Sequence, residues 1–187
     1  SRVVSLWVDP SRPPQAVGHA RIFAPALDGR LLALDAATGK PCVEFGERGA
    51  VNLLLDVRSQ FKEGDEWRDY LVTSPPAILD DKVIVGSAIG DNRAVLEELG
   101  IVRAYDARSG RLVWSWDPIP RKASNPVYKE WDPANIANAS AANAWAPLSV
   151  DARRRLVFVP TGSASPDFFG GLRPGDNRWA NSIVALD

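Results

Sequence analysis

Residues 101–116 of the chain read I-V-R-A-Y-D-A-R-S-G-R-L-V-W-S-W. Apolar and polar side chains alternate over Ile101–Tyr105, and a second strand-like run covers Leu112–Trp116. The polar residues between them, Asp106–Gly110, are typical of a tight turn. The stretch therefore predicts a strand, a turn and a second strand that share the skeleton A-x-D-x-x-x-G-x-x-x-W.

Each fixed position of this skeleton has a physical purpose. The carboxylate of Asp106 can accept hydrogen bonds from backbone amides of the turn, and Gly110 can adopt a positive φ. The small side chain of Ala104 leaves room at the sheet surface, which the large side chain of Trp114 can cover. One copy of this pattern predicts only an ordinary hairpin.

The skeleton recurs. Residues 33–39 read A-L-D-A-A-T-G, with Val43 at the tryptophan position, and residues 185–187 repeat the opening A-L-D. The copies are 71 and 81 residues apart, whereas simple propeller blades repeat every 40–45 residues or so. We therefore predict an all-β fold, a partial β-propeller whose units carry insertions.

Three blades are expected, over residues 1–47, 70–117 and 145–187. The segment 57–69 is charged and is predicted to leave the sheet, and 118–144 is predicted to be irregular. The long loop 161–179 is a place where a binding site is expected. The predicted strands cover residues 3–8, 21–26, 31–35, 70–73, 77–79, 83–87, 101–105, 112–116, 146–150, 156–160 and 181–186.

The composition excludes several classes of protein. The chain has 187 residues, of which 45% are hydrophobic, and a net charge of −1, so it lacks the basic field of a nucleic-acid-binding protein. Cys42 is the only cysteine, which rules out an internal disulfide. The single histidine, His19, lies outside any catalytic motif and is predicted to be structural or on the surface.

Four further motifs occur in the chain: T-S-P-P (73–76), G-S-A-I-G-D-N (86–92), N-A-W-A-P (143–147) and P-D-F-F-G-G-L-R-P-G-D-N-R (166–178). Together with the tryptophan repeat, they resemble the quinoprotein dehydrogenases. The strongest resemblance is to the membrane-bound glucose, quinate and shikimate dehydrogenases that depend on pyrroloquinoline quinone (PQQ). This resemblance implies an eight-bladed propeller, of which the chain would supply about three blades.

The resemblance also implies a cofactor site. Trp145 matches the residue on whose face PQQ lies, and Thr73 matches a threonine near the polar edge of the quinone. Ser165 stands where relatives place a threonine near the metal or cofactor, and Arg2 stands where they have an arginine that pairs with the cofactor. From the residues alone, Trp145 is more readily a core or blade-packing tryptophan, Thr73 a strand residue whose hydroxyl bonds to the backbone, and Ser165 an ordinary loop serine.

Asp91 and Asn92 match the Asp-Asn pair that holds a divalent cation in the family. Carboxylate and amide oxygens suit Ca²⁺ or Mg²⁺, although G-D-N can also form a simple turn. The resemblance assigns no catalytic residue to this chain, because the catalytic aspartate of the family would follow Asp187.

The implied function is oxidation of a sugar or cyclic polyol, with electrons passing to ubiquinone. The implied location is the periplasmic side of the bacterial inner membrane, with membrane contact through parts outside this chain. We expect the chain to be a piece of a longer protein that is inactive and aggregation-prone alone. Two alternatives are a non-catalytic propeller that serves as a protein-binding scaffold and a lectin-like propeller that binds sugars.

Overall fold

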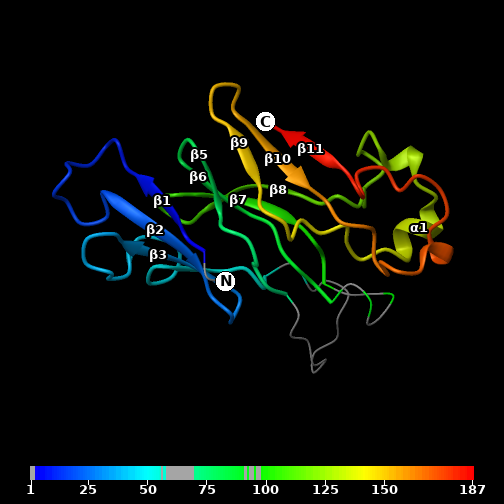
Figure 1. Cartoon of the computed structure of the whole chain (residues 1–187), viewed down its shortest axis with the longest axis horizontal. Helices are drawn as coiled ribbons and strands as arrows, with labels where there is room; N and C mark the ends of the chain where they lie inside the picture. Colours follow the sequence, from blue (N-terminus) through cyan, green and yellow to red (C-terminus); the bar gives the residue numbers. More distant parts are fainter. Residues whose placement is uncertain (1–2, 56, 58–69, 91, 93–94, 96–97) are drawn as a thin grey trace.

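The computed structural model describes residues 3–55, 57, 70–90, 92, 95 and 98–187. Within this part the chain forms three antiparallel β-sheets that follow one another in space (Figure 1). The first sheet contains β1 (Ser5–Val8), β2 (Ala20–Pro25), β3 (Arg30–Asp35) and β4 (Ala50–Asn52). The second contains β5 (Ala77–Leu79), β6 (Lys82–Val85), β7 (Val102–Asp106) and β8 (Leu112–Trp116). The third contains β9 (Ser149–Asp151), β10 (Leu156–Pro160) and β11 (Ile183–Leu186).

The sheets pack face to face, and their first strands β1, β5 and β9 lie next to one another. Between the first two sheets a buried core contains Phe23, Leu31, Ala33, Val83, Val85 and Tyr105. Between the second and third sheets a separate core contains Ile84, Val102, Ala104, Val157 and Val159. Successive antiparallel sheets of three or four strands that pack in this way are the blades of a β-propeller, so the predicted all-β, partial-propeller fold is confirmed.

Short helices occur outside the sheets. The 3₁₀ helices are η1 (Tyr128–Glu130) and η2 (Gly170–Leu172), and the single α-helix of the described residues is α1 (Pro133–Ala137). Asp132 caps α1 by accepting a hydrogen bond of 2.7 Å from the Ala134 amide, and Pro133 occupies the first helical position. Among the described residues, no helix has the length and apolarity required to cross a lipid bilayer.

The turn of the repeated skeleton is built as the sequence predicts. The Asp106 carboxylate accepts hydrogen bonds from the Arg108 amide at 3.1 Å and from the Ser109 amide at 2.7 Å, and Gly110 has φ 71°. The Ser109 carbonyl then accepts a hydrogen bond of 2.8 Å from the Gly46 amide in the first sheet's segment. The turn that closes the second blade is thus also a contact with the first.

The first copy of the skeleton repeats this geometry. The Asp35 carboxylate accepts a hydrogen bond of 2.8 Å from the Thr38 amide, and Gly39 has φ 69°. The tryptophan position differs between the copies: Trp114 is half-buried against the core of the second and third sheets, whereas Val43 is 70% exposed. Trp114 therefore stabilises a junction between blades, and Val43 does not.

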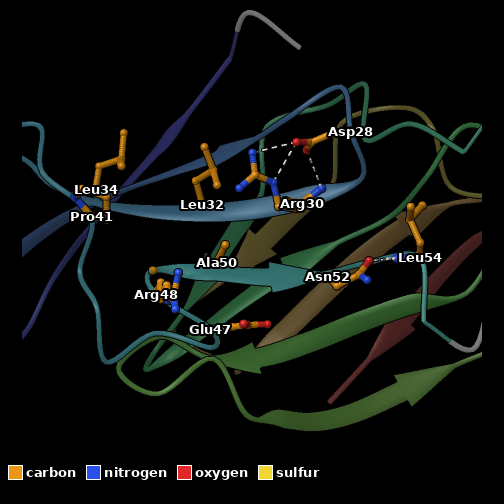
Figure 2. A pocket seen from close by; sticks show the side chains of 11 residues that line it. Asp28, Arg30, Leu32, Leu34, Pro41, Glu47, Arg48, Ala50, Asn52 and Leu54 are labelled. Carbon is orange, nitrogen blue, oxygen red and sulfur yellow. Dashed lines mark hydrogen bonds and ion pairs between the residues drawn. The ribbon is translucent and has the colours of Figure 1, made fainter.

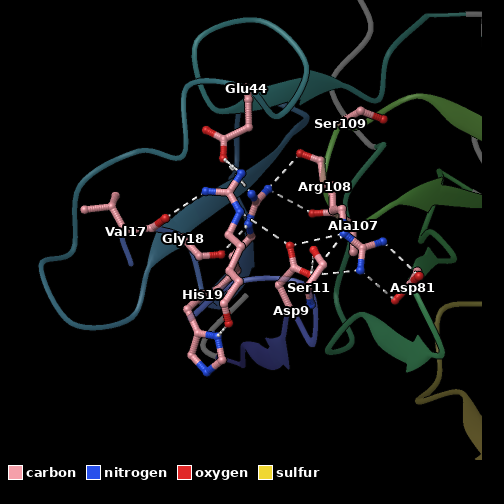
Figure 3. Close-up of polar contacts among 12 residues, drawn as sticks. Asp9, Ser11, Val17, Gly18, His19, Glu44, Asp81, Ala107, Arg108 and Ser109 are labelled. Atoms are coloured by element: carbon pink, nitrogen blue, oxygen red, sulfur yellow. Dashed lines mark hydrogen bonds and ion pairs between the residues drawn. The ribbon is translucent and has the colours of Figure 1, made fainter. Parts of the chain in front are cut away.

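A buried polar cluster joins the first two sheets (Figure 3). Asp9 is fully buried and accepts hydrogen bonds from Arg108, the shortest at 2.8 Å, while Arg108 also pairs with Asp81 at 2.8 Å. Arg21, also fully buried, donates to the carbonyls of Ala107 and Arg108 at 3.1 and 2.7 Å. Charged groups are rarely buried unless they are paired. Each of these contacts therefore restrains the position of the first sheet relative to the second.

Trp7 links the same cluster to the second sheet. Its indole N–H donates to the Asp80 carbonyl at 3.1 Å, and the guanidinium of Arg108 lies 5.0 Å from the centre of its ring. Such a cation–π contact adds attraction where the ring and the cation are both withdrawn from water. His19, predicted to be structural, has its Nδ1 atom 2.8 Å from the Arg12 carbonyl oxygen.

In the first half of the chain, one predicted strand is absent and one strand was not predicted. Residues 70–73 form only a bridge between Leu71 and Ala88, and Tyr70 and Val72 are buried in the core between the first two sheets. Strand β4 was not predicted and extends the first sheet to Asn52, beyond the expected blade end at 47. Val57, expected to lie outside the sheets with the rest of 57–69, is buried in the same core, and residues 58–69 lie outside the described part.

The second half differs in two places. Strand β9 begins at Ser149 rather than at 146, since residues 145–148 form an irregular segment that contacts the second sheet's loops. The stretch 118–144 is not entirely irregular: it contains η1 and α1 and packs against the loop 161–180 through a third core, which includes Ile119, Trp131, Ile136, Ala164 and Ala180. Burial of scattered alanines and tryptophans is not visible as a period in the sequence.

Replacing Asp9 with Asn removes the charge that pairs with Arg108. At pH 7 we expect the full-length protein to lose about 2 kcal/mol of unfolding free energy, because the guanidinium keeps only part of its hydrogen bonding. Chemical denaturation measures this loss. The matched control is Glu130→Gln, which weakens the exposed pair between Glu130 and Arg178 and should change stability little.

The loss should depend on pH. Burial by itself raises the pKa of the Asp9 carboxyl, but hydrogen bonds from Arg108 and Ser11 outweigh burial and hold the pKa well below its ordinary value. A carboxyl with a lowered folded-state pKa stabilises the fold above its unfolded pKa of about 3.9, and this stability is lost as the pH falls towards the folded-state pKa. The difference between the wild type and Asp9→Asn should therefore shrink from about pH 5 to about pH 2. A constant difference would contradict this assignment.

Substitutions at two equivalent glycines distinguish the cost of backbone strain from the cost of a steric clash. Gly39 and Gly110 have nearly the same φ, but a Cβ atom on Gly39 would meet no atom within 4 Å, whereas one on Gly110 would lie 2.6 Å from the Gly46 nitrogen. Gly39→Ala should cost about 1 kcal/mol and Gly110→Ala about 1–3 kcal/mol more. Thermal denaturation of both variants tests this, and equal losses would show that the turn does not pack tightly against the first sheet.

Candidate cofactor site

The predicted cofactor residues lie on loops that precede neighbouring strands. Thr73 comes four residues before β5, and Trp145 comes four residues before β9. Because β5 and β9 contact each other, these two loops meet at one end of the sheets. The hydroxyl of Thr73 donates a hydrogen bond of 2.9 Å to the Trp145 carbonyl, and the hydroxyl of Ser74 donates to the same oxygen at 2.6 Å.

The segment 143–145 is held from several directions. The side-chain amide of Asn143 donates to the Ser87 carbonyl at 3.0 Å, and the Asn143 carbonyl accepts from the Gly162 amide at 3.0 Å. A Cβ atom on Gly86 would lie 2.2 Å from the Ala144 carbonyl oxygen, so only glycine permits this approach. The backbone under Trp145 is therefore fixed by three separate loops.

The side chain of Trp145 is not fixed in the same way. It is 56% exposed, whereas Trp7 and Trp131 are buried. Within the described part of the chain, the Trp145 side chain is therefore not part of a buried core. A rigid backbone that carries an open indole face is a suitable platform for a flat aromatic ligand.

Ser165 has a different environment. It is fully buried, its Oγ accepts a hydrogen bond of 3.0 Å from the Ala141 amide, and its own amide donates to the Ala141 carbonyl at 2.7 Å. These bonds join the loop 161–179 to the segment before Trp145. In this structure the Ser165 side chain serves that loop contact.

Of the predicted metal pair only Asn92 can be placed, because Asp91 lies outside the described residues. The predicted cofactor residue Arg2 also lies outside them. Asn92 is exposed, and its Oδ1 accepts a hydrogen bond of 2.8 Å from the Phe168 amide. A carbonyl oxygen has two lone pairs, so this atom can also bind a cation. Among the described residues, no group of three or more His, Cys, Asp or Glu side chains could hold a metal.

A buried carboxylate lies in the loop that carries Asn92. Glu98 is fully buried, and within the described part of the chain neither of its oxygens has a hydrogen-bond partner. Burying a carboxylate without a hydrogen-bond partner is costly. Asn92 and Glu98 are the described residues of loop 86–101 whose side-chain oxygens are of the type that a hard divalent cation prefers.

The long loop between β10 and β11 is held by a buried arginine. Nη2 of Arg173 lies 3.3 Å from the Ser163 hydroxyl and 3.3 and 3.2 Å from the carbonyls of Pro166 and Asp167. Residues 163–167 are therefore tied to their own loop and, through Ser165, to the Trp145 segment. The loop 161–179 thus borders the candidate site at Gly162 and is bonded to the segment before Trp145 through Ser165.

Two residues of the site were missed at the level of sequence. Ser74 follows Thr73 in the T-S-P-P motif. Its hydroxyl, next to that of Thr73, could have indicated a second hydrogen-bond donor at this position. Phe168, which belongs to the P-D-F-F-G-G motif, is joined to Asn92 only through its backbone amide, and no side-chain pattern predicts that contact.

A wide surface cavity of about 600 Å³ lies elsewhere, on the first sheet (Figure 2). Leu32 and Leu34 line it and alternate along β3 with Leu31 and Ala33, which face the second sheet. Charged residues at its rim include the pair of Arg30 with Asp28. In a closed propeller another sheet covers this face, so we assign the cavity to sheet packing.

Comparison with known proteins agrees with this geometry. The family model for the PQQ "Glucose/ethanol/alcohol dehydrogenase, beta-propeller domain" matches residues 1–187. Quinoprotein glucose dehydrogenase A of Acinetobacter calcoaceticus is 36% identical over 168 residues, which are 89% of this chain and 20% of that protein. Quinate/shikimate dehydrogenase (quinone) of Acinetobacter baylyi is 38% identical over 168 residues, again 89% of this chain and 20% of that protein.

A solved structure shows the same fold. The crystal structure of quinohemoprotein alcohol dehydrogenase from Comamonas testosteroni superimposes with a TM-score of 0.65 at 30% identity, covering 89% of this chain and 24% of that one. The chain thus spans about a fifth of the length of the curated relatives that it matches. Sequence, fold and the placement of the motifs agree: the chain belongs to the family of PQQ-dependent dehydrogenases and forms part of its β-propeller domain.

Proposed function

We propose that this chain contributes the cofactor platform of a PQQ-dependent dehydrogenase that oxidises a sugar or cyclic polyol. The observation that carries the proposal is the open indole of Trp145 on a backbone held by Thr73, Ser74 and Gly162. The substrate class follows the names of the relatives, which include glucose and quinate/shikimate dehydrogenases.

In this proposal the residues of the chain bind and orient. Trp145 stacks against the flat cofactor, and the hydroxyls of Thr73 and Ser74 keep its backbone in place. Bound PQQ would supply the acceptor for the hydride removed from the substrate alcohol. Arg2 would pair with an oxygen of the cofactor, and Ser165 would hold the loop next to it.

The cation site would use Asp91 and the free lone pair of the Asn92 oxygen, with Ca²⁺ or Mg²⁺ as the bound ion. No catalytic residue is assigned to the chain. The general base that takes the proton of the substrate hydroxyl would come from another part of the polypeptide.

The destination of the electrons is a further part of the proposal. Ubiquinone is the proposed acceptor, supported by the word "quinone" in the name of the quinate/shikimate relative. The proposed place of action is the periplasmic side of the bacterial inner membrane, with membrane contact made outside this chain. The isolated chain would be inactive, because its cofactor site needs the remaining blades.

The experiment that tests the proposal is a titration of the full-length apo-protein with PQQ, with and without Ca²⁺ or Mg²⁺, followed by dye reduction with glucose, quinate and glycerol. Binding and turnover that both require the cation would support it. A well-folded protein that neither binds PQQ nor reduces dye would be the protein-binding scaffold instead.

Trp145→Ala tests the platform itself. Loss of the stacked indole removes apolar contact and aromatic attraction worth about 2 kcal/mol, so the Kd for PQQ should rise roughly 30-fold. Quenching of the remaining tryptophans measures the Kd. The control is Val17→Ala, an exposed apolar residue on the loop between β1 and β2, which should leave the Kd unchanged.

Two hydroxyl variants separate positioning from direct contact. Thr73→Val and Ser74→Ala each remove one hydrogen bond to the Trp145 carbonyl, worth about 1 kcal/mol, so each should raise the PQQ Kd by roughly 3–10-fold. Thr73→Ser should restore the wild-type value. An effect of Thr73→Val without one of Ser74→Ala would mean that Thr73 contacts the cofactor directly and does not act through Trp145.

A further inference from the structure

An arginine that lies outside every motif of the resemblance contacts the segment that leads to Trp145. Residues 139–145 form neither strand nor helix, and the first four of them are fully buried. A buried backbone carbonyl outside regular structure needs a donor from elsewhere. Nη1 of Arg121 donates to the Ala139 carbonyl at 2.8 Å, and Nη2 donates to the Ser140 carbonyl. The guanidinium thus supplies donors for the start of this segment.

Arg121 is itself held at the end of the second sheet. Asp117, the residue after β8, accepts a hydrogen bond of 2.9 Å from Nε of Arg121 and another of 2.9 Å from the Ile119 amide. The side chains of Arg121 and Asp117 are only 23% and 19% exposed, and Pro118 and Pro120 restrict the backbone between them. All three guanidinium nitrogens are bonded in a planar fork, which fixes the orientation of the group.

The rest of the segment is packed closely. Ala141 is bonded to Ser165 in both directions, and a Cβ atom on Gly100 would lie 2.6 Å from the Cβ atom of Asn143. Loss of the guanidinium would leave two buried carbonyls without these donors, and their backbone would have to move to satisfy them. Close packing leaves little free volume to absorb such a movement, so it is passed along the backbone to Trp145.

We propose that Arg121, anchored by Asp117, is a positioning residue for the cofactor platform and fixes where the Trp145 indole lies. This inference rests on the proposed function and extends it to a residue that no motif contains. Arg121 acts without touching the cofactor, because its nitrogens are bonded to Asp117 and to the carbonyls of Ala139 and Ser140. Its effect on cofactor binding therefore depends on the presence of the indole.

The test is a double-mutant cycle in the full-length protein, with the PQQ Kd measured in Ca²⁺ by quenching of tryptophan fluorescence. Arg121→Met keeps the length of the side chain and removes its donors, so the Kd should rise about tenfold. In the Trp145→Ala background the same substitution should change the Kd by less than about twofold, because no indole is left to position. The control is Arg154→Met, which breaks an exposed pair with Asp151 and should leave the Kd unchanged in both backgrounds.

A second variant distinguishes positioning from a failure to fold. Arg121→Lys keeps a positive charge beside Asp117, but a single ammonium group cannot reproduce the fork that binds both carbonyls. Its thermal midpoint should stay close to that of the wild type, while the PQQ Kd should rise about threefold. Trp145→Ala should abolish this rise as well.

Three results would overturn the inference. Wild-type Kd values in both Arg121 variants would mean that the guanidinium does not position the indole. An equal rise in Kd with and without the Trp145 indole would mean that Arg121 stabilises the fold as a whole. A wild type that does not bind PQQ would remove the proposed function too, whereas the first two results leave that function intact.

Discussion

The contact between each sheet and the next is the constraint on which the structure depends. A sheet of three or four short strands cannot bury both faces alone, and here each junction buries a separate apolar core. At the first junction the buried charges of Asp9 and Arg21 and the half-buried Arg108 add directional contacts to this packing. A different packing of the two sheets would leave those charges without partners. The cluster therefore fixes how the sheets are oriented as well as holding them together.

The site follows from the same arrangement. Since β5 and β9 are neighbours, the loops that precede them are brought together, and the Thr73 and Ser74 hydroxyls reach the Trp145 carbonyl. Gly86 then allows the backbone of Ala144 to come close. An exposed indole on a fixed backbone is thus a product of sheet packing, and binding a flat cofactor would require little further ordering.

The sequence predicted the features that depend on local chemistry. The turn at Asp106 and Gly110 and its repeat at Asp35 were correct because both need only side-chain hydrogen bonds and a positive φ. Features that depend on distant contacts were missed: Tyr70 serves a core instead of a strand, and Ser165 is bonded to Ala141. The resemblance named the candidate site residues through their motifs, whereas the hydroxyls that bond to the Trp145 carbonyl are a property of the folded loops.

We propose that Trp145 and Asn92 belong to one cofactor site. An experimental structure of the full-length protein with PQQ and Ca²⁺ tests this. We expect the quinone to lie flat on the Trp145 indole and the Asn92 oxygen to lie about 2.3–2.6 Å from the cation. A quinone bound away from Trp145, or a cation bound without Asn92, would contradict it.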